Sequence, residues 1–271
     1  MSKKKRRDIP KFQTPIFETH CHLDYLDTAD LESTLARATD AGVVQIITIA
    51  VSADNMDKVY DLAHSSPTIW GTQGIHPHEV ASYTLDVERT IRERCADPRI
   101  VAVGEIGLDY YYDHADRATQ RAVFEQQLQI AADLDMPVVI HSRDADDDTH
   151  SILNNFSSSL LKRGVIHSFT SSLSLAEFAL EQGFMLGFNG ITTFNNADNV
   201  RAVVAITPLK HILLETDAPY LTPVPYRGRV NAPCYLPFIA EKIAEIKNCD
   251  VEGLLSQAWD NSLSLFFEGS I

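Results

Sequence analysis

Residues 16–22 read Ile-Phe-Glu-Thr-His-Cys-His, and this stretch decides the fold that we expect. The apolar run Ile16–Thr19 is typical of a short strand and leads directly into His20 and His22. Side chains alternate along a strand, so these two imidazoles point to the same side, with Cα atoms about 6.6 Å apart. Both can therefore reach one metal ion. A His-x-His pair alone also occurs on ordinary half-exposed strands, so its meaning depends on the rest of the chain.

The same arrangement recurs at four later points. Metal-competent side chains follow apolar runs at Ile100–Gly104 (Glu105), Val138–Ile140 (His141), Val165–Ile166 (His167) and Ile212–Leu214 (Glu215 and Asp217). In a (β/α)8 barrel, catalytic groups lie at the carboxyl ends of the strands, on one face. An ordinary core has no reason to repeat the pattern at five separate runs. The sequence therefore favours a barrel.

Strands that alternate with helices complete the expected architecture. Three more apolar runs indicate strands, at Val44–Ala50, Thr68–Gly74 and Met185–Phe188. Periodicity and end signals predict helices from Leu31 up to Gly42, and at Thr119–Asp135, Ser172–Gln182, Cys234–Lys247 and Val251–Phe267. An open dinucleotide-binding sheet would require GxGxxG, but Gly104 and Gly107 supply only GxxG. We expect an α/β protein with one (β/α)8 TIM-barrel domain spanning residues 15–271.

Residues 1–14 form a basic segment outside the predicted barrel. Five of the first seven residues are lysine or arginine, and no apolar segment follows them, so they do not form a secretory signal. We expect a solvated, disordered tail, with a phosphate-seeking arm as the alternative. No apolar run approaches the ~18–20 residues that cross a bilayer, so we expect no membrane insertion. Four cysteines without a CxxC pair indicate free thiols and a cytoplasmic location.

The net charge of −14 limits how the chain can bind nucleic acid. Proteins that cover an extended duplex carry a basic surface, because neutralising phosphates supplies most of the nonspecific affinity. If DNA is the substrate, we expect the site to grip a short or single-stranded end near bound cations, which reverse the local sign of the field. Nothing in the sequence indicates an obligate protein partner.

Four imidazoles and two carboxylates exceed what a single ion needs if it is to keep an open coordination position. We expect two divalent metal ions per chain, bridged by Glu105. The residues His20, His22 and Asp217 are assigned to one ion, and His141 and His167 to the other. Mixed nitrogen and oxygen ligands suit Zn, Mn or Fe and tolerate Mg less well, which leaves the identity of the metal open.

A pair of divalent ions indicates hydrolysis. Two ions about 3.5–4 Å apart lower the pKa of a water between them and stabilise the developing oxyanion. Glu105 belongs to the catalytic centre as the bridge. Asp217 is the candidate general base, and a role as a pure ligand is an equal alternative. The residues alone thus predict a metal-dependent hydrolase.

The sequence also resembles a known family, from about Ile16 to Phe266. The segments that carry the resemblance are residues 18–24 (Glu-Thr-His-Cys-His-Leu-Asp), 74–77 (Gly-Ile-His-Pro), 104–109 (Gly-Glu-Ile-Gly-Leu-Asp), 137–143 (Pro-Val-Val-Ile-His-Ser-Arg), 167–169 (His-Ser-Phe), 187–194 and 214–219 (Leu-Glu-Thr-Asp-Ala-Pro). Together they are similar to the TatD family of metal-dependent deoxyribonucleases, within the amidohydrolase-like superfamily. The resemblance implies a TIM barrel, two divalent ions and 3′→5′ exonuclease action on DNA. It also implies that Arg227 and Arg229 lie over the site and hold substrate phosphate.

Three positions depart from the usual pattern of that family. Glu18 stands where Asp is usual before the His pair, Arg229 replaces a usual Lys, and Ala232 takes the place of a frequent Glu. None of the three is a predicted metal ligand. The departures therefore bear on the choice of substrate and leave the predicted metal site intact.

Other polar residues near the predicted ligands have candidate roles. We expect His76, after the third strand, to contact substrate or to support a ligand rather than to bind metal itself, and Arg143 to bind phosphate. Asp109 is expected to orient a ligand imidazole through its second ring nitrogen, or else to cap a loop. Glu215 points into the barrel, where an unpaired carboxylate is costly, so we expect it to partner a ligand. Of Tyr110–Tyr112, at least two are expected to pack against a neighbouring loop rather than stack on a base.

Three functions remain open at this point. The first is cleavage of phosphodiester bonds by a 3′→5′ exodeoxyribonuclease, which Arg227 and Arg229 favour. The second is hydrolysis of another ester or amide, such as a lactone, a phosphotriester or an aminoacyl-tRNA ester, because fold and metals do not choose the substrate. The third is a binding module without catalysis, against which the complete set of metal-competent side chains argues.

Overall fold

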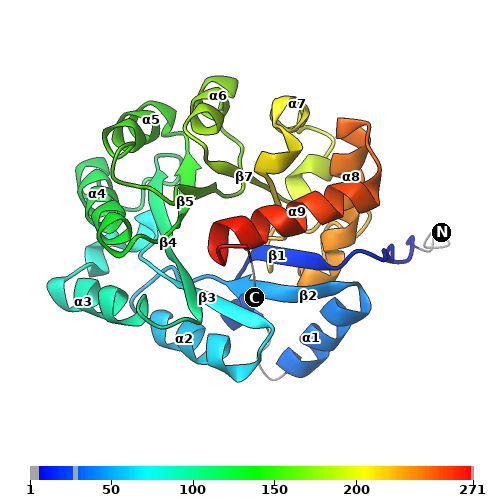
Figure 1. Ribbon diagram of the computed structural model, residues 1–271, viewed down its shortest axis with the longest axis horizontal. Helices are drawn as coiled ribbons and strands as arrows, with labels where there is room; N and C mark the ends of the chain where they lie inside the picture. The colour runs from blue at the N-terminus through cyan, green and yellow to red at the C-terminus, as the bar shows by residue number, and fades with distance from the viewer. Residues whose placement is uncertain (1–5, 27–29, 270–271) are drawn as a thin grey trace.

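Eight parallel strands form a single sheet that curls into a barrel (Figure 1). The structure is a computed structural model and describes residues 6–26 and 30–269. Neighbouring strands pair in chain order, with bounds Ile16–Cys21 (β1), Val43–Thr48 (β2), Ile69–Gln73 (β3), Ile100–Asp109 (β4), Val138–Arg143 (β5), Gly164–Ile166 (β6), Met185–Phe188 (β7) and Ile212–Leu214 (β8). The prediction of a (β/α)8 TIM barrel is confirmed.

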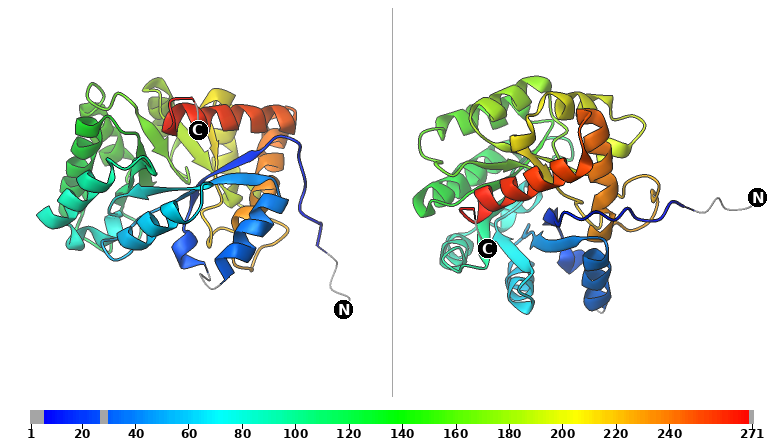
Figure 2. Two further views of the ribbon diagram at one scale, coloured as in Figure 1. Left: turned by 60° about the horizontal axis from the view of Figure 1, so that its bottom comes forward. Right: turned by 45° about the vertical axis from the view of Figure 1, so that its right-hand side comes forward.

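Helices connect the strands and lie around the outside of the barrel (Figure 1 and Figure 2). Their bounds are Leu31–Asp40 (α1), Met56–Ser65 (α2), Leu85–Arg94 (α3), Arg117–Leu134 (α4), Asp146–Asn155 (α5), Leu173–Glu181 (α6), Asp198–Ile206 (α7), Leu236–Lys247 (α8) and Val251–Phe266 (α9). The sequence predictions include α1, α4, α6, α8 and α9 but not the other four. Within the described residues, no helix is long and apolar enough to span a bilayer.

Apolar side chains fill the ring of strands and close one of its ends. Phe17, Val139 and Leu213 belong to the buried cluster inside the barrel. The final helix, α9, contributes to the same cluster, and its Trp259 ring lies 5.6 Å from the ring of Phe17 near the start of β1. Figure 1 shows α9 crossing the ring of strands. The amino-terminal end of the barrel is thereby blocked, and the carboxyl ends of the strands form the open face.

Hydrogen bonds join the first strand to the segment of the last one and complete the ring. The Thr19 hydroxyl donates to the carbonyl oxygen of Leu214 at 3.0 Å. The backbone N–H of Asp217, three residues after β8, donates to the carbonyl oxygen of His20 at 2.9 Å. Two predicted ligands from distant parts of the sequence are thus linked through their own backbone.

The fourth strand carries an irregularity at a predicted ligand. It extends to Asp109, past the predicted end at Gly104. Its register with β5 pairs Gly104 and Ile106 with consecutive residues, so Glu105 between them is an extra residue. A bulge of this kind re-aims a side chain, and bulges are frequent next to active sites. This local departure from regular pairing turns the carboxylate of Glu105 toward the open face.

The described part of the predicted tail, residues 6–14, contacts the barrel. Arg7 forms an ion pair with Glu241 at 2.5 Å. The backbone N–H groups of Gln13 and Thr14 both donate to the carboxylate of Glu252, at 2.9 Å. Residues 1–5 lie outside the described residues.

Candidate metal centre

The predicted metal ligands meet at the carboxyl ends of the strands. A cavity of about 750 Å³ opens there. The ligands that line it are His22, Glu105, His141, His167 and Asp217. His20 is buried beside them, with Nε2 3.5 Å from a carboxylate oxygen of Glu105. The structure therefore brings all six predicted ligands together.

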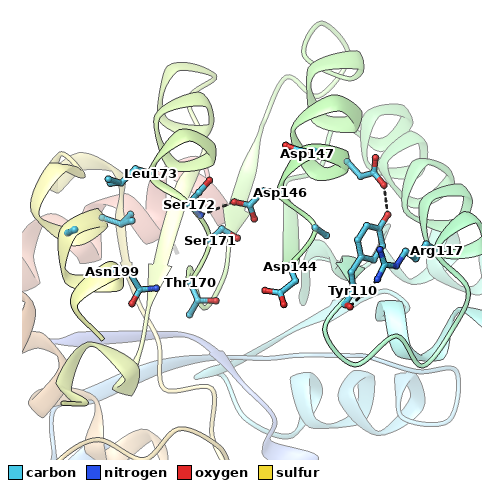
Figure 3. Close-up of a pocket in the computed structure, with 14 residues that line it drawn as sticks. Tyr110, Arg117, Asp144, Asp146, Asp147, Thr170, Ser171, Ser172, Leu173 and Asn199 are labelled. Carbon is cyan, nitrogen blue, oxygen red and sulfur yellow. Dashed lines mark hydrogen bonds between the residues drawn. The ribbon is translucent and has the colours of Figure 1, made fainter. Parts of the chain in front are cut away.

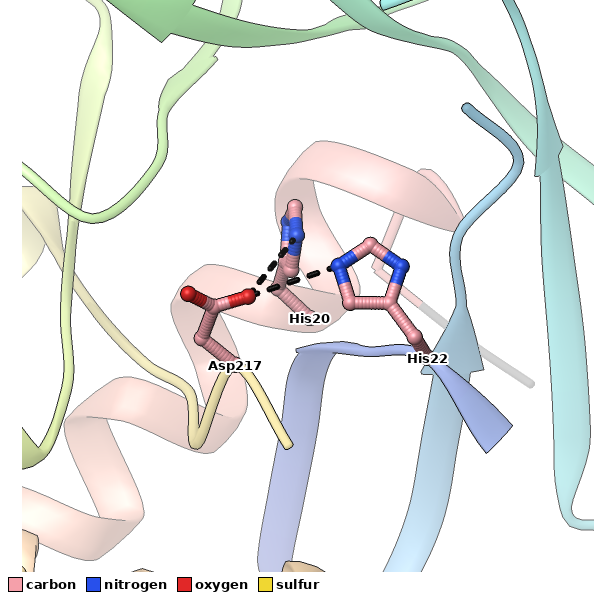
Figure 4. A group of neighbouring side chains, drawn as sticks. All are labelled: His20, His22 and Asp217. Atoms are coloured by element: carbon pink, nitrogen blue, oxygen red, sulfur yellow. Dashed lines mark ion pairs between the residues drawn. The ribbon is translucent and has the colours of Figure 1, made fainter. Parts of the chain in front are cut away.

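His20, His22 and Asp217 form one group of potential ligands (Figure 4). The Nε2 atoms of His22 and His20 lie 3.4 and 3.8 Å from the same oxygen, Oδ1 of Asp217. Asp217 has a left-handed φ of 56°, a conformation that aspartate tolerates better than most residues. Burial opposes the ionised form of Asp217, but the hydrogen bond from His22 outweighs burial and lowers the pKa of Asp217. An ionised oxygen thus faces two imidazole nitrogens.

Glu105 lies among four imidazoles. Its Oε1 atom is 2.8 Å from His167 Nε2, 3.1 Å from His141 Nδ1 and 3.5 Å from His76 Nε2. Its Oε2 atom is the one that faces His20. Burial opposes the ionised form of Glu105, but the positive charge of His167 and the hydrogen bonds from His141 and His167 outweigh burial and hold the pKa of this carboxyl well below its usual value. The carboxylate stays ionised, with one oxygen directed to each side of the cluster.

His76 lies beside the predicted ligands. Two more groups have ligand atoms within 4.8 Å of one another: His20 with Glu105 and His167, and His76 with Glu105 and His141. The sequence prediction gives His76 a contact with substrate and joins His141 to His167. In the structure, His141 Nδ1 and His167 Nε2 lie 3.3 Å apart, and His76 is a further imidazole next to His141. His76 follows β3 at the same barrel face, so the strand-end pattern that identified the other ligands applies to it as well.

The surroundings of His20 fit a metal ion. Among residues 6–26 and 30–269, neither ring nitrogen of this imidazole has a hydrogen-bond partner, although the side chain is buried. An unsatisfied buried polar group costs about 1–3 kcal/mol, and coordination of a cation removes that cost. Burial lowers the pKa of His20, so the imidazole is neutral and keeps the lone pair that a metal requires. The mixed nitrogen and oxygen donors fit Zn²⁺ or Mn²⁺.

The six predicted ligands and His76 are called the metal cluster below. Asp109 connects this cluster to the loop after β4. Its Oδ2 atom lies 3.0 Å from His141 Nε2, the ring nitrogen that faces away from the cluster, and 3.0 Å from His78 Nε2. Its Oδ1 atom accepts the backbone N–H groups of Tyr111 and Tyr112, at 3.0 and 2.9 Å. Burial opposes its charge, but hydrogen bonds from His141 and His78 lower the pKa of Asp109. A carboxylate in this position fixes the imidazole so that Nδ1 points at the other ligands.

Replacing Asp109 with Asn is expected to weaken metal binding about 10- to 100-fold. The amide oxygen can still accept the two backbone N–H groups, but the amide nitrogen in place of Oδ2 cannot accept a proton from His141. Calorimetric titration of the metal-depleted protein with Zn²⁺ or Mn²⁺ measures the change. Asp116→Asn is the matched control, because Asp116 also accepts two backbone N–H groups, at the start of α4, and lies outside the ligand groups. Equal metal affinities in the two variants would contradict the orienting role.

Two further carboxylates are buried next to the ligands. Glu215 Oε1 lies 3.7 Å from His167 Nδ1. Glu18 Oε1 accepts the backbone N–H groups of His20 and Thr216, at 3.1 and 2.9 Å. Burial raises the pKa of Glu18 to about 8. Glu18 therefore holds the ends of β1 and β8 together, a role that sequence reasoning missed, although its place immediately before the His pair was a signal.

The four residues predicted to bind substrate lie in different surroundings. His76 and Arg143 line the cavity of the metal cluster. Arg227 and Arg229 are exposed on the loop after β8 and do not belong to its lining. The guanidinium carbon of Arg227 lies instead 3.8 Å from the centre of the Phe194 ring. The structure thus brings only the first two of these residues to the cluster.

Two of the three consecutive tyrosines after β4 are exposed. Tyr111 and Tyr112 line the cavity and are 57% and 51% exposed, whereas Tyr110 packs against the core. Tyr112 also contacts His78 in the loop after β3, with ring centres 5.5 Å apart, so the expectation that at least two of the three pack against a neighbouring loop stays a prediction. The Asp109 carboxylate accepts the backbone N–H groups of Tyr111 and Tyr112 and so holds the turn that carries both rings.

A second cavity, of about 820 Å³, adjoins the first and is acidic (Figure 3). Asp144 and Thr170 line both cavities. The acidic residues of the second cavity are Asp144, Asp146, Asp147 and Asp148. Figure 3 shows one of them, Asp146, accepting the backbone N–H of Ser172, at 2.8 Å. Negative charge on this side of the metal cluster disfavours the passage of phosphate groups.

Comparisons with known proteins agree with this geometry. A family model described as TatD related DNase matches residues 17–267. The chain is 34% identical over 253 residues to the uncharacterized metal-dependent hydrolase YabD of Bacillus subtilis strain 168, which covers 93% of this chain and 98% of that protein. It is 33% identical over 243 residues to a protein of Erwinia tasmaniensis named 3′-5′ ssDNA/RNA exonuclease TatD, covering 88% of this chain and 93% of that one.

The fold is also similar to that of a solved structure. The crystal structure of YjjV, a TatD homologue from Escherichia coli K12, superposes with a TM-score of 0.87 at 32% sequence identity. The match covers 93% of this chain and 97% of that one. The whole barrel, including the strand ends that carry the cluster, is therefore shared.

Proposed function

Because the chain belongs to the TatD family of metal-dependent hydrolases, we propose that it removes nucleotides from the 3′ end of short or single-stranded DNA by hydrolysing phosphodiester bonds. The observation that carries the proposal is the cluster around Glu105, where three groups of ligand atoms share residues on the open face of the barrel. The name of the Erwinia tasmaniensis relative supports this reaction.

We assign two divalent cations, with Zn, Mn or Mg as candidates, to this cluster. The residues His20, His22 and Asp217 would hold one cation, and His141 and His167 the other, with His76 next to His141. Glu105 would join the two sides, since each of its oxygens faces a different part of the cluster. Two cations in such a site supply a water of lowered pKa and positive charge opposite the anion that develops in the transition state.

The chain's own residues complete the chemistry. Asp217 is ionised and lines the cavity, so it can accept the proton of the attacking water. Arg143, on the cavity wall, carries a guanidinium group that can bind two oxygens of the same phosphate. These two side chains come from different strand ends and face the same cavity, as nucleophile activation and phosphate binding require.

The dimensions and charge of the site support an end-bound substrate. A cavity of about 750 Å³ has the volume of a site for a small molecule, and therefore admits the end of a strand rather than a long stretch. The net charge of −14 and the acidic second cavity disfavour contacts to many phosphates at once. Positive charge is concentrated where the cations and Arg143 lie.

We also propose that the protein works in a reducing compartment, the cytoplasm. All four cysteines are free thiols, and Cys21, Cys95 and Cys234 are buried. Free cysteines are typical of proteins in reducing compartments.

A panel of substrates tests the proposed reaction. Oligonucleotides labelled at the 5′ end should shorten stepwise from the 3′ end, faster as single strands than as blunt duplexes. Chelator should abolish the reaction, and added Zn²⁺, Mn²⁺ or Mg²⁺ should restore it. A lactone, a phosphotriester and p-nitrophenyl esters serve as competing substrates. Metal-dependent turnover of one of these without release of nucleotides would contradict the nuclease and favour hydrolysis of another ester.

A further inference from the structure

An exposed aromatic surface lies at the mouth of the metal cavity. The rings of Tyr111 and Tyr112 are 4.9 Å apart at an angle of 90°. The guanidinium carbon of Arg143 lies 4.0 and 4.8 Å from the two ring centres. The ring of His114 is parallel to that of Tyr112, 5.7 Å away. These four side chains are called the aromatic platform below, and its two tyrosines leave more than half of their surface open to water.

The platform is held at a fixed place relative to the metal ligands. The same Asp109 carboxylate accepts the backbone N–H groups of both tyrosines and contacts the outer nitrogen of His141. The second ring, Tyr112, also contacts His78, whose ring is 5.5 Å away and nearly perpendicular. An exposed ring on a loose loop would lose conformational freedom on binding a ligand, and the hydrogen bonds to Asp109 reduce that cost because they fix the backbone that carries these rings.

We propose that the aromatic platform stacks an unpaired nucleobase of the strand whose phosphate lies at the metal cluster, and that this stacking selects single-stranded ends. The inference rests on the proposed function and names the feature of the substrate that the site recognises. Every base presents a flat face, so stacking on tyrosine tolerates any sequence. A base within a duplex is already paired and stacked, and it must be extruded at a cost before it can bind here.

The charges around the metal cluster also favour a path of the DNA strand over the aromatic platform. Arg143 lies within the platform, where its positive charge attracts the phosphate next to a stacked base. On the other side, the second cavity carries four aspartates and one arginine, Arg117, which is bound to Asp113. A strand that leaves the metal cluster over the platform avoids this negative charge.

Matched double variants test the stacking. Tyr111→Leu/Tyr112→Leu removes both rings, whereas Tyr111→Phe/Tyr112→Phe keeps them and removes only the hydroxyl groups. The substrates are single-stranded tetranucleotides with a base at every position, and copies in which one position at a time is abasic. We expect the Leu variant to lower kcat/KM on the intact strand about 5- to 150-fold, mainly through KM, and the Phe variant to retain activity. On the copy that lacks the stacked base, wild type and Leu variant should cleave at equal rates.

Other outcomes separate this inference from the proposed function. An equal loss of activity on intact and abasic strands would show that the tyrosines act only structurally, and an unchanged KM in the Leu variant would show that they do not bind substrate. Either result overturns the stacking while leaving the nuclease in place. If no strand is cleaved, the stacking can still be tested by binding. The tetranucleotide then carries 2-aminopurine, a base whose fluorescence is quenched when it stacks on a ring. Quenching by wild type and the Phe variant but not by the Leu variant supports the platform, and its absence in wild type overturns it.

Discussion

Replacing Glu105 with Gln is expected to abolish hydrolysis and to lower the number of bound metal ions. The carboxylate of Glu105 faces four imidazoles, those of His20, His76, His141 and His167. Its loss therefore removes the negative charge between the ligands proposed for the two cations. Positive charge in such a site contributes several kcal/mol to transition-state stabilisation, and its misplacement lowers kcat about 10³-fold or more. Metal analysis of the purified protein and single-turnover kinetics measure the two effects.

A surface carboxylate provides the control for this variant. Glu93, on α3, lies 3.9 Å from Arg89 in an exposed ion pair, and such pairs contribute little to stability. Glu93→Gln should keep full metal content and full activity. A Glu105→Gln protein that binds metal and hydrolyses substrate like the Glu93→Gln protein would exclude a bridging role for Glu105.

The barrel and the meeting of the candidate ligands on one face were predictable because one local pattern specifies both. A buried parallel strand is a short apolar run, and its carboxyl end faces the site, so a polar residue after the run marks strand and ligand together. This pattern located His141 after three consecutive apolar residues. It also located His167 after a run of only two, where composition alone would not distinguish a strand from a loop.

The helices that escaped prediction differ among themselves. The α3 helix buries only Ile91, and α5 starts with Asp146, Asp147 and Asp148, of which none is buried. By contrast, α2 and α7 each bury three apolar side chains, although they are only ten and nine residues long. Apolar runs this short do not distinguish a helix from a strand in the sequence, and the strand-to-strand returns along the outside of the barrel, a requirement of the whole fold, decide the assignment.

The grouping of the ligands depends on distances that a strand pattern does not contain. The bulge at Glu105 shifts the register of β4 by one residue and so changes the direction of the Glu105 carboxylate. It is visible only in the pairing of β4 with β5. The place of His76 beside His141 depends on the order of the strands around the ring, where β3, β4 and β5 are neighbours. The exposed position of Tyr111 depends on the buried carboxylate of Asp109, which accepts its backbone N–H. The bulge and the place of His76 follow from tertiary contacts between segments that are separate in the sequence, whereas the turn at Tyr111 is local, because Asp109 is only two residues earlier.

The largest effect without loss of metal is expected for Asp217→Asn. The amide oxygen can still coordinate a cation, although more weakly than the carboxylate, so metal content under saturating metal should stay close to that of the wild type. The amide cannot accept a proton, so kcat should fall about 10²- to 10⁴-fold if the carboxylate is the general base. Metal analysis together with kcat under saturating metal measures both quantities.

The pH dependence of this variant distinguishes a base from a ligand. The pKa of Asp217 lies below its usual value of 3.8, so its carboxylate is ionised throughout the neutral range and wild-type kcat should not follow its titration there. Without an internal base, the proton of the attacking water must pass to hydroxide, and log kcat of Asp217→Asn should rise with a slope of about 1 per pH unit. A pure ligand would behave differently: metal content would fall, added metal would restore the rate, and the pH profile would match the wild type. Because the two roles move different observables, a single variant decides between them.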